Sequence, residues 1–132
     1  MFTEDKTTLQ IPNQFTLFGH RYTVVFDKDL YEKEGCYGTA DDDFKLIRLQ
    51  PPGEVLKRYE DDGVMKEEKF VITDNVVIET FFHEVNHIIL DAIGENQLSE
   101  NEKFVNMLGK AWLEIYLSNR HEKVSKEKET RN

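Results

Sequence analysis

Residues 73–93 constrain the fold of this chain more than any other segment, because their apolar side chains recur with the period of an α-helix. These side chains cover one broad face, which has to pack against a core. They are Phe81, Phe82, Val85, Ile88, Ile89, Ala92 and Ile93. Thr73, Asp74 or Asn75 can cap the first turn, and a glycine at position 94 can end the last turn. The sequence therefore predicts a long amphipathic helix over residues 73–93.

The residues before this helix are predicted to form short strands. Residues 15–26 contain two apolar stretches separated by a Gly-His pair, which is typical of a tight hairpin. Residues 36–38 and 44–49 flank a run of three aspartates, and this pattern predicts a second hairpin. Residues 54–70 are highly charged and contain an Asp-Gly turn, so they form either a protruding hairpin or a mobile loop.

A second helix is expected after the first, beginning near Ser99 and ending near Tyr116. Residues 118–132 contain five basic and three acidic residues and almost no apolar ones, which predicts a charged, disordered tail. Strands followed by helices predict the α+β fold class. The length of 132 residues allows one domain, which we place at residues 1–117.

The composition excludes several classes of protein. With 26 acidic and 17 basic residues the chain has a net charge of −9, so nucleic acid and anionic membranes would repel it. No apolar run approaches the roughly 18 residues of a membrane span, and the polar N-terminus is unlike a secretory signal. The single cysteine, Cys36, rules out an intramolecular disulfide and fits a reducing compartment. We therefore expect a cytoplasmic protein.

The predicted long helix contains the motif H-E-x-x-H, formed by His83, Glu84 and His87. The two histidines are one helical turn apart on the same face, so they can bind one Zn²⁺ together. Glu84 lies beside them and can take a proton from a zinc-activated water as a general base. The motif therefore makes both histidines candidate zinc ligands and Glu84 the candidate catalytic residue.

The polar face of this helix supports that interpretation. Within roughly 100° of one another, opposite the apolar face, lie Thr80, His83, Glu84, His87 and Asp91. The alternative is an ordinary solvated face, or one buried histidine that is hydrogen-bonded to a neighbour. Asp91, one turn after His87, either orients that histidine or is a solvated residue at the helix end.

A catalytic zinc site needs a third protein ligand and leaves one position open for water. Glu102 is the preferred candidate, because Gly109 on the same side of its helix allows a close approach to the first helix. Glu100 is the alternative ligand. Ser99-x-x-Glu102 also matches a capping box, in which the carboxylate only satisfies a backbone N–H. Asn106, one turn after Glu102, is a candidate hydrogen-bond partner for a histidine.

Residues 79–91, ETFFHEVNHIILD, and residues 101–109, NEKFVNMLG, resemble the zincin metallopeptidases, specifically the gluzincin branch with its glutamate ligand. In detail the chain is similar to small phage- and prophage-encoded members, which are similar to the ImmA/IrrE-type proteases. The resemblance covers about half of the chain, and H-E-x-x-H is its most specific part. It implies that His83, His87 and Glu102 ligate zinc and that Glu84 is the general base.

The resemblance also implies a small twisted β-sheet before the zinc helix, with an edge strand that binds an extended substrate by strand addition. Residues 45–50, KLIRLQ, are the candidate edge strand. A further group usually stabilises the oxyanion, and the candidates here are Tyr37, Arg48 and Tyr116. Thermolysin-like relatives carry an acidic residue four positions after the glutamate ligand, where this chain has Asn106.

Two functions follow as expectations. The first is a zinc-dependent metallopeptidase that hydrolyses a protein or peptide, with basic segments favoured by the acidic chain. The second is a catalytically silent zincin-like module that binds a protein and holds a structural or vestigial zinc.

Overall fold

The computed structural model describes residues 10–130, and the side chains of residues 10–119. Strands fill most of the first half of the chain and helices fill the second, so the α+β fold class is confirmed. In chain order the elements are β1 (Gln14–Leu17), β2 (His20–Phe26), α1 (Leu30–Glu34), β3 (Gly38–Asp41), β4 (Leu46–Leu49), β5 (Gly53–Asp61), β6 (Val64–Ile72), α2 (Asp74–Ala92), α3 (Asn96–Glu100) and α4 (Glu102–Thr130).

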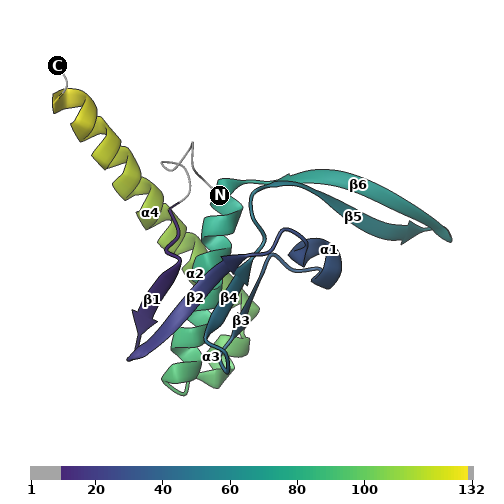
Figure 1. Cartoon of the computed structure of the whole chain (residues 1–132), viewed down its shortest axis with the longest axis horizontal. Helices are drawn as coiled ribbons and strands as arrows, with labels where there is room; N and C mark the ends of the chain where they lie inside the picture. The colour runs from purple at the N-terminus through teal and green to yellow at the C-terminus, as the bar shows by residue number, and fades with distance from the viewer. Residues whose placement is uncertain (1–9, 131–132) are drawn as a thin grey trace.

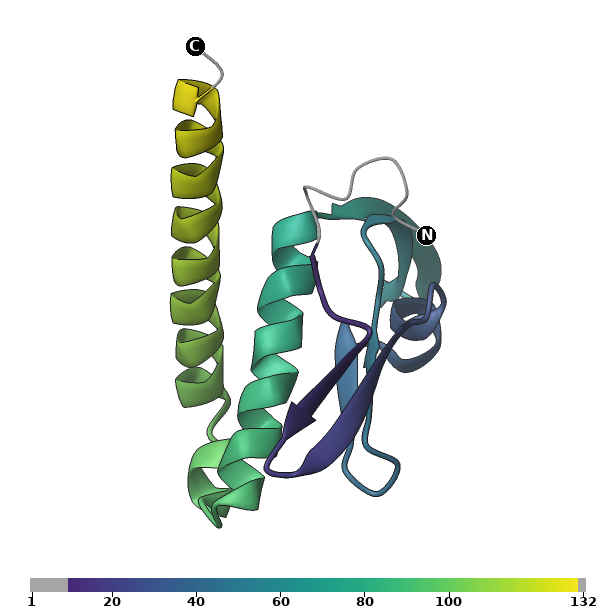
Figure 2. The same ribbon diagram turned by 60° about the vertical axis from the view of Figure 1, so that its left-hand side comes forward.

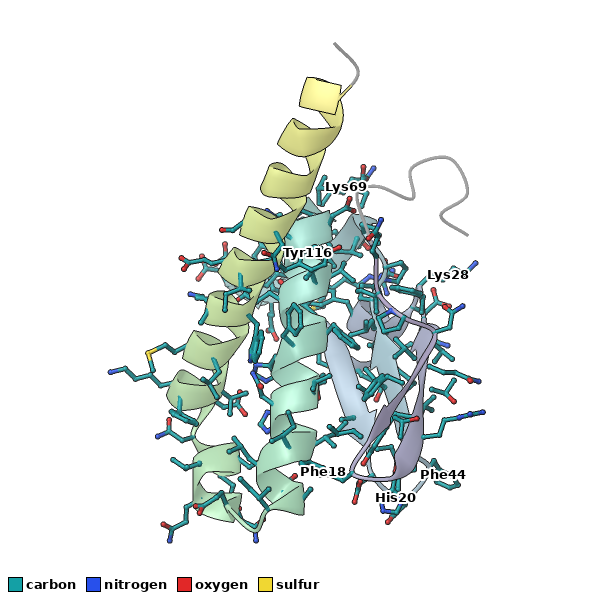
Figure 3. The ribbon with its side chains drawn as sticks, turned by 90° about the vertical axis from the view of Figure 1, so that its left-hand side faces the viewer. Phe18, His20, Lys28, Phe44, Lys69 and Tyr116 are labelled. Carbon is teal, nitrogen blue, oxygen red and sulfur yellow. The ribbon has the colours of Figure 1, made fainter. Side chains whose placement is uncertain are left out.

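The first four strands form one sheet in the order β1-β2-β4-β3 (Figure 1). β1 pairs antiparallel with β2, and β3 pairs antiparallel with β4. β2 and β4 are parallel neighbours, and the connection between them contains α1 and β3. Phe18 and Phe44 lie exposed at the turns of the two antiparallel pairs, at the same end of the sheet (Figure 3). Both hairpins that the sequence predicts are therefore confirmed.

β4 lies inside the sheet, so the prediction that residues 45–50 form the edge strand is wrong. β4 pairs with β2 on one side and with β3 on the other. Its Ile47 and Leu49 are fully buried, and a strand with so apolar a face belongs in the centre of a sheet. The edge that contacts α2 is β3, whose short sequence GTAD has no apolar alternation to mark it as a strand.

β5 and β6 form a separate two-stranded hairpin that projects from the body of the molecule (Figure 1). Of the two alternatives for residues 54–70, the protruding hairpin is thus confirmed. Asp62 and Gly63 at its turn have φ values of 53° and 77°, which suit the tight turn of a two-residue hairpin. The base of the hairpin joins the core through Val55 and Ile72, which are 4% and 2% exposed.

α2 confirms the predicted helix over residues 73–93 and packs against the four-stranded sheet (Figure 2). The side chain of Thr73 caps it by accepting a hydrogen bond from the N–H of Val76 at 3.3 Å. Gly94, at φ 82°, follows its last turn. Buried side chains of α2 share one core with the strands. This core contains Tyr22, Val24, Ile47, Leu49, Val55, Ile72, Val77, Ile78, Phe81 and Ile88.

The second predicted helix is interrupted, because Asn101 is extended between the end of α3 and the start of α4. Asn101 caps α4 by accepting a hydrogen bond from the N–H of Phe104 on its side-chain oxygen at 3.1 Å. The predicted capping box at Ser99 is therefore wrong. Ser99 lies inside α3, and its side chain is buried.

α4 continues to Thr130, far beyond the end predicted near Tyr116 (Figure 2). A disordered tail was expected over residues 118–132. This is wrong for residues 118–130, which are helical, and residues 131–132 lie outside the described part of the chain. The helical segment contains no proline or glycine and is rich in lysine and glutamate, so its helix propensity is high. Among the helices described over residues 10–130, none is long and apolar enough to cross a membrane.

Candidate metal centre

Two histidines and one glutamate bring their side chains together where α2 passes the start of α4. His83 Nε2 and His87 Nε2 are 3.1 Å apart. The two carboxylate oxygens of Glu102 reach them, one lying 3.3 Å from His83 Nε2 and the other 3.3 Å from His87 Nε2. Within the described part of the chain, these three residues form a group that can hold a metal ion, and Glu100 is not among them.

Close packing of the two helices brings Glu102 to the histidines. Gly109 faces α2, and a Cβ built on it would lie 3.4 Å from the carbonyl oxygen of Glu79 and 3.7 Å from the backbone nitrogen of His83. A methyl group would fit there in van der Waals contact, so the two backbones are close and leave little room for a longer side chain. The close approach that the sequence predicts at Gly109 is confirmed, and Trp112 continues the contact by stacking on Phe82 at 6.0 Å.

The second ring nitrogen of His87 is held by a residue that the sequence analysis considers only as a helix start and cap. His87 Nδ1 lies 3.0 Å from the hydroxyl oxygen of Ser99. With Nε2 free to ligate a metal, Nδ1–H donates this hydrogen bond and fixes the orientation of the ring. Of the two alternatives for Asp91, the structure supports the solvated residue at the helix end, because Asp91 is exposed and Ser99 takes the place beside His87 Nδ1. Asn106 does hydrogen-bond to His83, as the sequence predicts.

Burial changes the acid–base properties of two residues of the motif. The pKa of Glu84 is raised to about 7, first because burial penalises the carboxylate and then because Glu102 adds a second negative charge. The pKa of His83 is lowered, mainly by burial and further by the positive charge that His87 can carry. The environment therefore favours a neutral imidazole, the form that binds metals, and a carboxyl group that exchanges protons near neutral pH.

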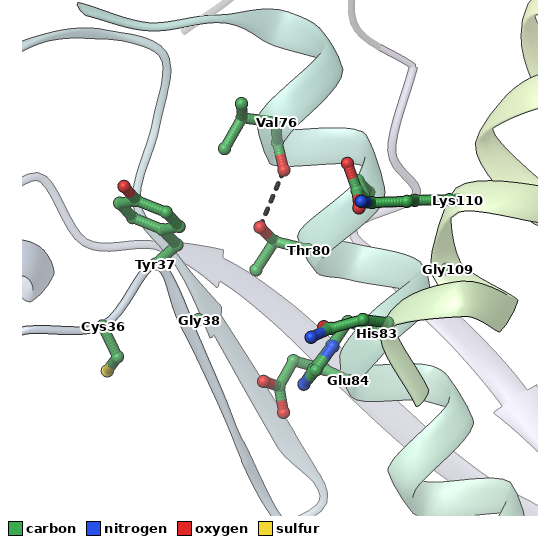
Figure 4. A pocket seen from close by; sticks show the side chains of 11 residues that line it. Cys36, Tyr37, Gly38, Val76, Thr80, His83, Glu84, Gly109 and Lys110 are labelled. Carbon is green, nitrogen blue, oxygen red and sulfur yellow. Dashed lines mark hydrogen bonds between the residues drawn. The ribbon is translucent and has the colours of Figure 1, made fainter. Parts of the chain in front are cut away.

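A cavity of about 420 Å³ opens beside this group, between the start of β3, α2 and α4 (Figure 4). Glu84 and His83 line it. Thr80 lies about one turn earlier on α2, near the start of β3, and lines it too. Lys110 of α4, which the sequence analysis did not consider, also lines this cavity. The cavity provides room for a ligand next to the candidate general base.

Glu84 also lines a second cavity of about 250 Å³, together with His87, Asp91 and the end of β3. β3 thus runs past both cavities, from Gly38 at the first to Ala40 at the second. A Cβ built on Gly38 would lie only 2.6 Å from Thr80 Cγ2, so this close approach of β3 to α2 requires glycine. Within the described chain one edge of β3 has no strand partner, and it borders the candidate site.

The three candidates for the oxyanion-stabilising group lie in different places. Tyr37 lines the larger cavity and stacks on Tyr31 with ring centroids 5.3 Å apart. Arg48 is held by Glu34 at 2.7 Å, on another part of the sheet. Tyr116 lies along α4 about four turns from Glu102, where its ring contacts Phe82 (Figure 3). Of the three, only Tyr37 lines the cavity that contains Glu84.

Comparison of the chain with protein-family models, with curated proteins and with solved structures finds no match. The geometry of the site and the sequence motif therefore carry the functional argument.

Proposed function

We propose that this chain is a zinc-dependent metallopeptidase. The observation that carries the proposal is the spacing of three donor atoms from His83, His87 and Glu102, which are 3.1 to 3.3 Å apart. Ligands bound tetrahedrally to zinc at about 2.0–2.1 Å would be roughly 3.3 Å from one another. Three such ligands leave a fourth position open, which is the arrangement of a catalytic site rather than a closed structural one.

The residues around this group have the properties that peptide hydrolysis requires. When bound, zinc supplies Lewis acidity toward the scissile carbonyl and the attacking water. Glu84 takes the proton from that water and passes it to the leaving amine, a task suited to a carboxyl group with a pKa of about 7. Ser99 holds His87, and Asn106 holds His83, so both imidazoles are positioned before any ligand arrives.

We further propose that the substrate is an extended protein or peptide segment that pairs with the unpartnered edge of β3. Strand addition would satisfy the backbone of both chains and would carry the segment past both cavities and Glu84. The acidic chain, with a net charge of −9, favours a basic segment and disfavours nucleic acid or an anionic membrane as partner.

The test combines metal analysis with cleavage. Untagged protein purified without chelator should contain about one zinc per chain, and the His87→Ala variant should have lost it. Glu84→Gln should keep the zinc but lose peptide cleavage by a factor of at least about 100, because a general base typically contributes that much. Absence of zinc after titration, or cleavage that survives in Glu84→Gln, would contradict the proposal.

One observation favours a second candidate function, a catalytically silent module that binds a protein. The unpartnered edge of β3 and the projecting β5–β6 hairpin, with Val64 and Met65 exposed at its tip, offer binding surfaces that need no chemistry. A partner that binds the wild type and Glu84→Gln equally, and is cleaved by neither, would favour this function.

A further inference from the structure

One flank of α4, about a quarter turn from the face that contacts α2, carries an apolar stripe. We call it the outer stripe, and it consists of Phe104, Leu108, Ala111 and Ile115. These residues follow one another at intervals of four, three and four, which is the spacing of a helix–helix seam in a coiled coil. Ile115 is 52% exposed, and beside the stripe Met107 and Trp112 are 60% and 47% exposed.

The described fold covers this stripe only in part. α4 attaches to the body mainly through another face, where Val105 is fully buried and Gly109 touches α2. The sheet lies on the far side of α2 (Figure 2), and along the stripe Phe104 and Leu108 are half-buried, whereas Ala111 and Ile115 are exposed. A contiguous apolar face on a helix otherwise rich in charge is typical of an interaction site.

The stripe is complementary to itself when a second copy is turned end for end. The midpoint of the stripe lies between Leu108 and Ala111, so an antiparallel copy places these two residues opposite each other. Phe104 then lies opposite Ile115 at both ends. The central layers thus pair the larger Leu108 with the smaller Ala111, and the outer layers pair two large apolar side chains.

The charges beside the stripe favour the same orientation. Lys103 and Glu114 lie on one flank, one on each side of the midpoint. An antiparallel copy brings Lys103 of one chain near Glu114 of the other, twice by symmetry, because equivalent flanks face each other only in that orientation.

The extension of α4 adds a second complementary contact. After Leu117 the chain has five basic and three acidic residues, whereas before Ser118 it has 12 basic and 23 acidic residues. Antiparallel pairing carries this basic segment of one copy past the start of the other α4, toward α3. Glu95 and Glu100 are exposed there. The two segments therefore have net charges of opposite sign.

We propose that the outer stripe of α4 is the interface of a homodimer in which the two α4 helices run antiparallel. This inference goes beyond the proposed peptidase function and does not depend on zinc or on cleavage.

The first experiment measures the mass of the full chain in solution by sedimentation equilibrium, over concentrations up to the millimolar range. The wild type should form a dimer, and Ile115→Glu should be monomeric with an unchanged far-ultraviolet circular dichroism spectrum, because the side chain is exposed in the single chain. Val71→Glu on the β5–β6 hairpin, where Val71 is 65% exposed, is the matched control and should remain dimeric. A monomeric wild type, or a dimeric Ile115→Glu variant, would overturn the proposal.

A charge exchange then tests the orientation. Lys103→Glu and Glu114→Lys should each weaken the dimer several-fold, because each one places like charges opposite each other. The double variant should recover the dissociation constant of the wild type, since the pairs are restored with their signs reversed. High salt should reduce all three effects. Failure of the double variant to recover would contradict the antiparallel arrangement.

Discussion

α2 and α4 lie side by side, but they use their surfaces in different ways. α2 packs one face into the core and presents its histidines and Glu84 on another, so nearly every side of it has a role. α4 supplies one ligand and one packing face, leaves Met107 and Ile115 exposed, and continues beyond the body as a single helix (Figure 1). The comparison teaches that the site is built on a helix packed into the core and completed by a helix whose far end extends beyond it.

The largest effect should come from removing a core side chain of α2. Ile78 is 1% exposed, so Ile78→Ala should lower the free energy of unfolding by about 2–5 kcal/mol, through lost burial and the cavity left behind. The matched change Ile93→Ala, at a site that is 58% exposed, should cost about 0.5 kcal/mol or less. Urea denaturation of both variants checks this contrast, and equal losses would contradict the packing described for α2.

A slightly smaller effect should come from the buried carboxyl group of α2. Because the pKa of Glu84 is raised to about 7 in the folded chain, the folded state keeps a proton that the unfolded state has already released. Stability therefore falls as the pH rises from the ordinary glutamate pKa toward 7, and the full penalty is present above that pH. Zinc-free Glu84→Gln should then be more stable than the wild type by about 3 kcal/mol above pH 7.

Below the ordinary glutamate pKa, wild type and Glu84→Gln should have converging stabilities, because Glu84 is then protonated in both the folded and unfolded states. The measurement is a series of denaturation curves across pH in the presence of chelator. The control is Glu114→Gln, which removes an exposed glutamate from α4. A stability difference for Glu84→Gln that does not vary with pH would contradict the burial of this carboxyl group.

An intermediate effect should come from the contact that joins α3 to the site. Ser99→Ala removes the hydrogen-bond partner of His87 Nδ1, so the zinc dissociation constant should rise by about 10–100-fold. Ser118→Ala, in the exposed part of α4, is the matched control and should leave zinc binding unchanged. Competition with a zinc-binding dye measures both variants. If Ser99→Ala and Ser118→Ala bound zinc with equal affinity, Ser99 would not position the histidine.

The smallest effects on stability should come from the two helix caps, which should differ in their influence on zinc binding. Thr73→Ala and Asn101→Ala should each cost about 1 kcal/mol of stability, because each removes a side-chain acceptor from a helix N-terminus. Only Asn101→Ala should also weaken zinc binding, since Asn101 immediately precedes Glu102. Loss of zinc affinity in Thr73→Ala would mean that the far end of α2 influences the site.

The parts of the fold that the sequence predicts well are those set by local patterns. The apolar period and the caps place α2, and the Asp62-Gly63 turn places the β5–β6 hairpin. β3 is not marked in the same way, because its GTAD sequence lacks alternation and its position depends on the close contact of Gly38 with α2. The extent of α4 is misjudged because a charged segment that buries nothing can still have high helix propensity.

The residues of the candidate site also divide into those that a local sequence pattern predicts and those that depend on contacts between elements. His83 and His87 lie on one helix, so the helical period alone brings them together. Glu102 lies on another helix, and its position is suggested by Gly109, which marks the close contact. The contact of Ser99 with His87 is missed because the sequence predicts a helix that begins near Ser99, whereas α4 begins after Asn101. Asn101, two positions later, is an equally good cap residue, and placing the cap there would have left Ser99 available for another role.

The division of the three donor atoms between two helices has a consequence for motion. An ion held by them would join the first turn of α4 to the middle of α2. The binding free energy of the ion would then become part of the free energy that keeps α4 attached. The supply of metal in the surroundings would therefore change how firmly this long helix is attached to α2.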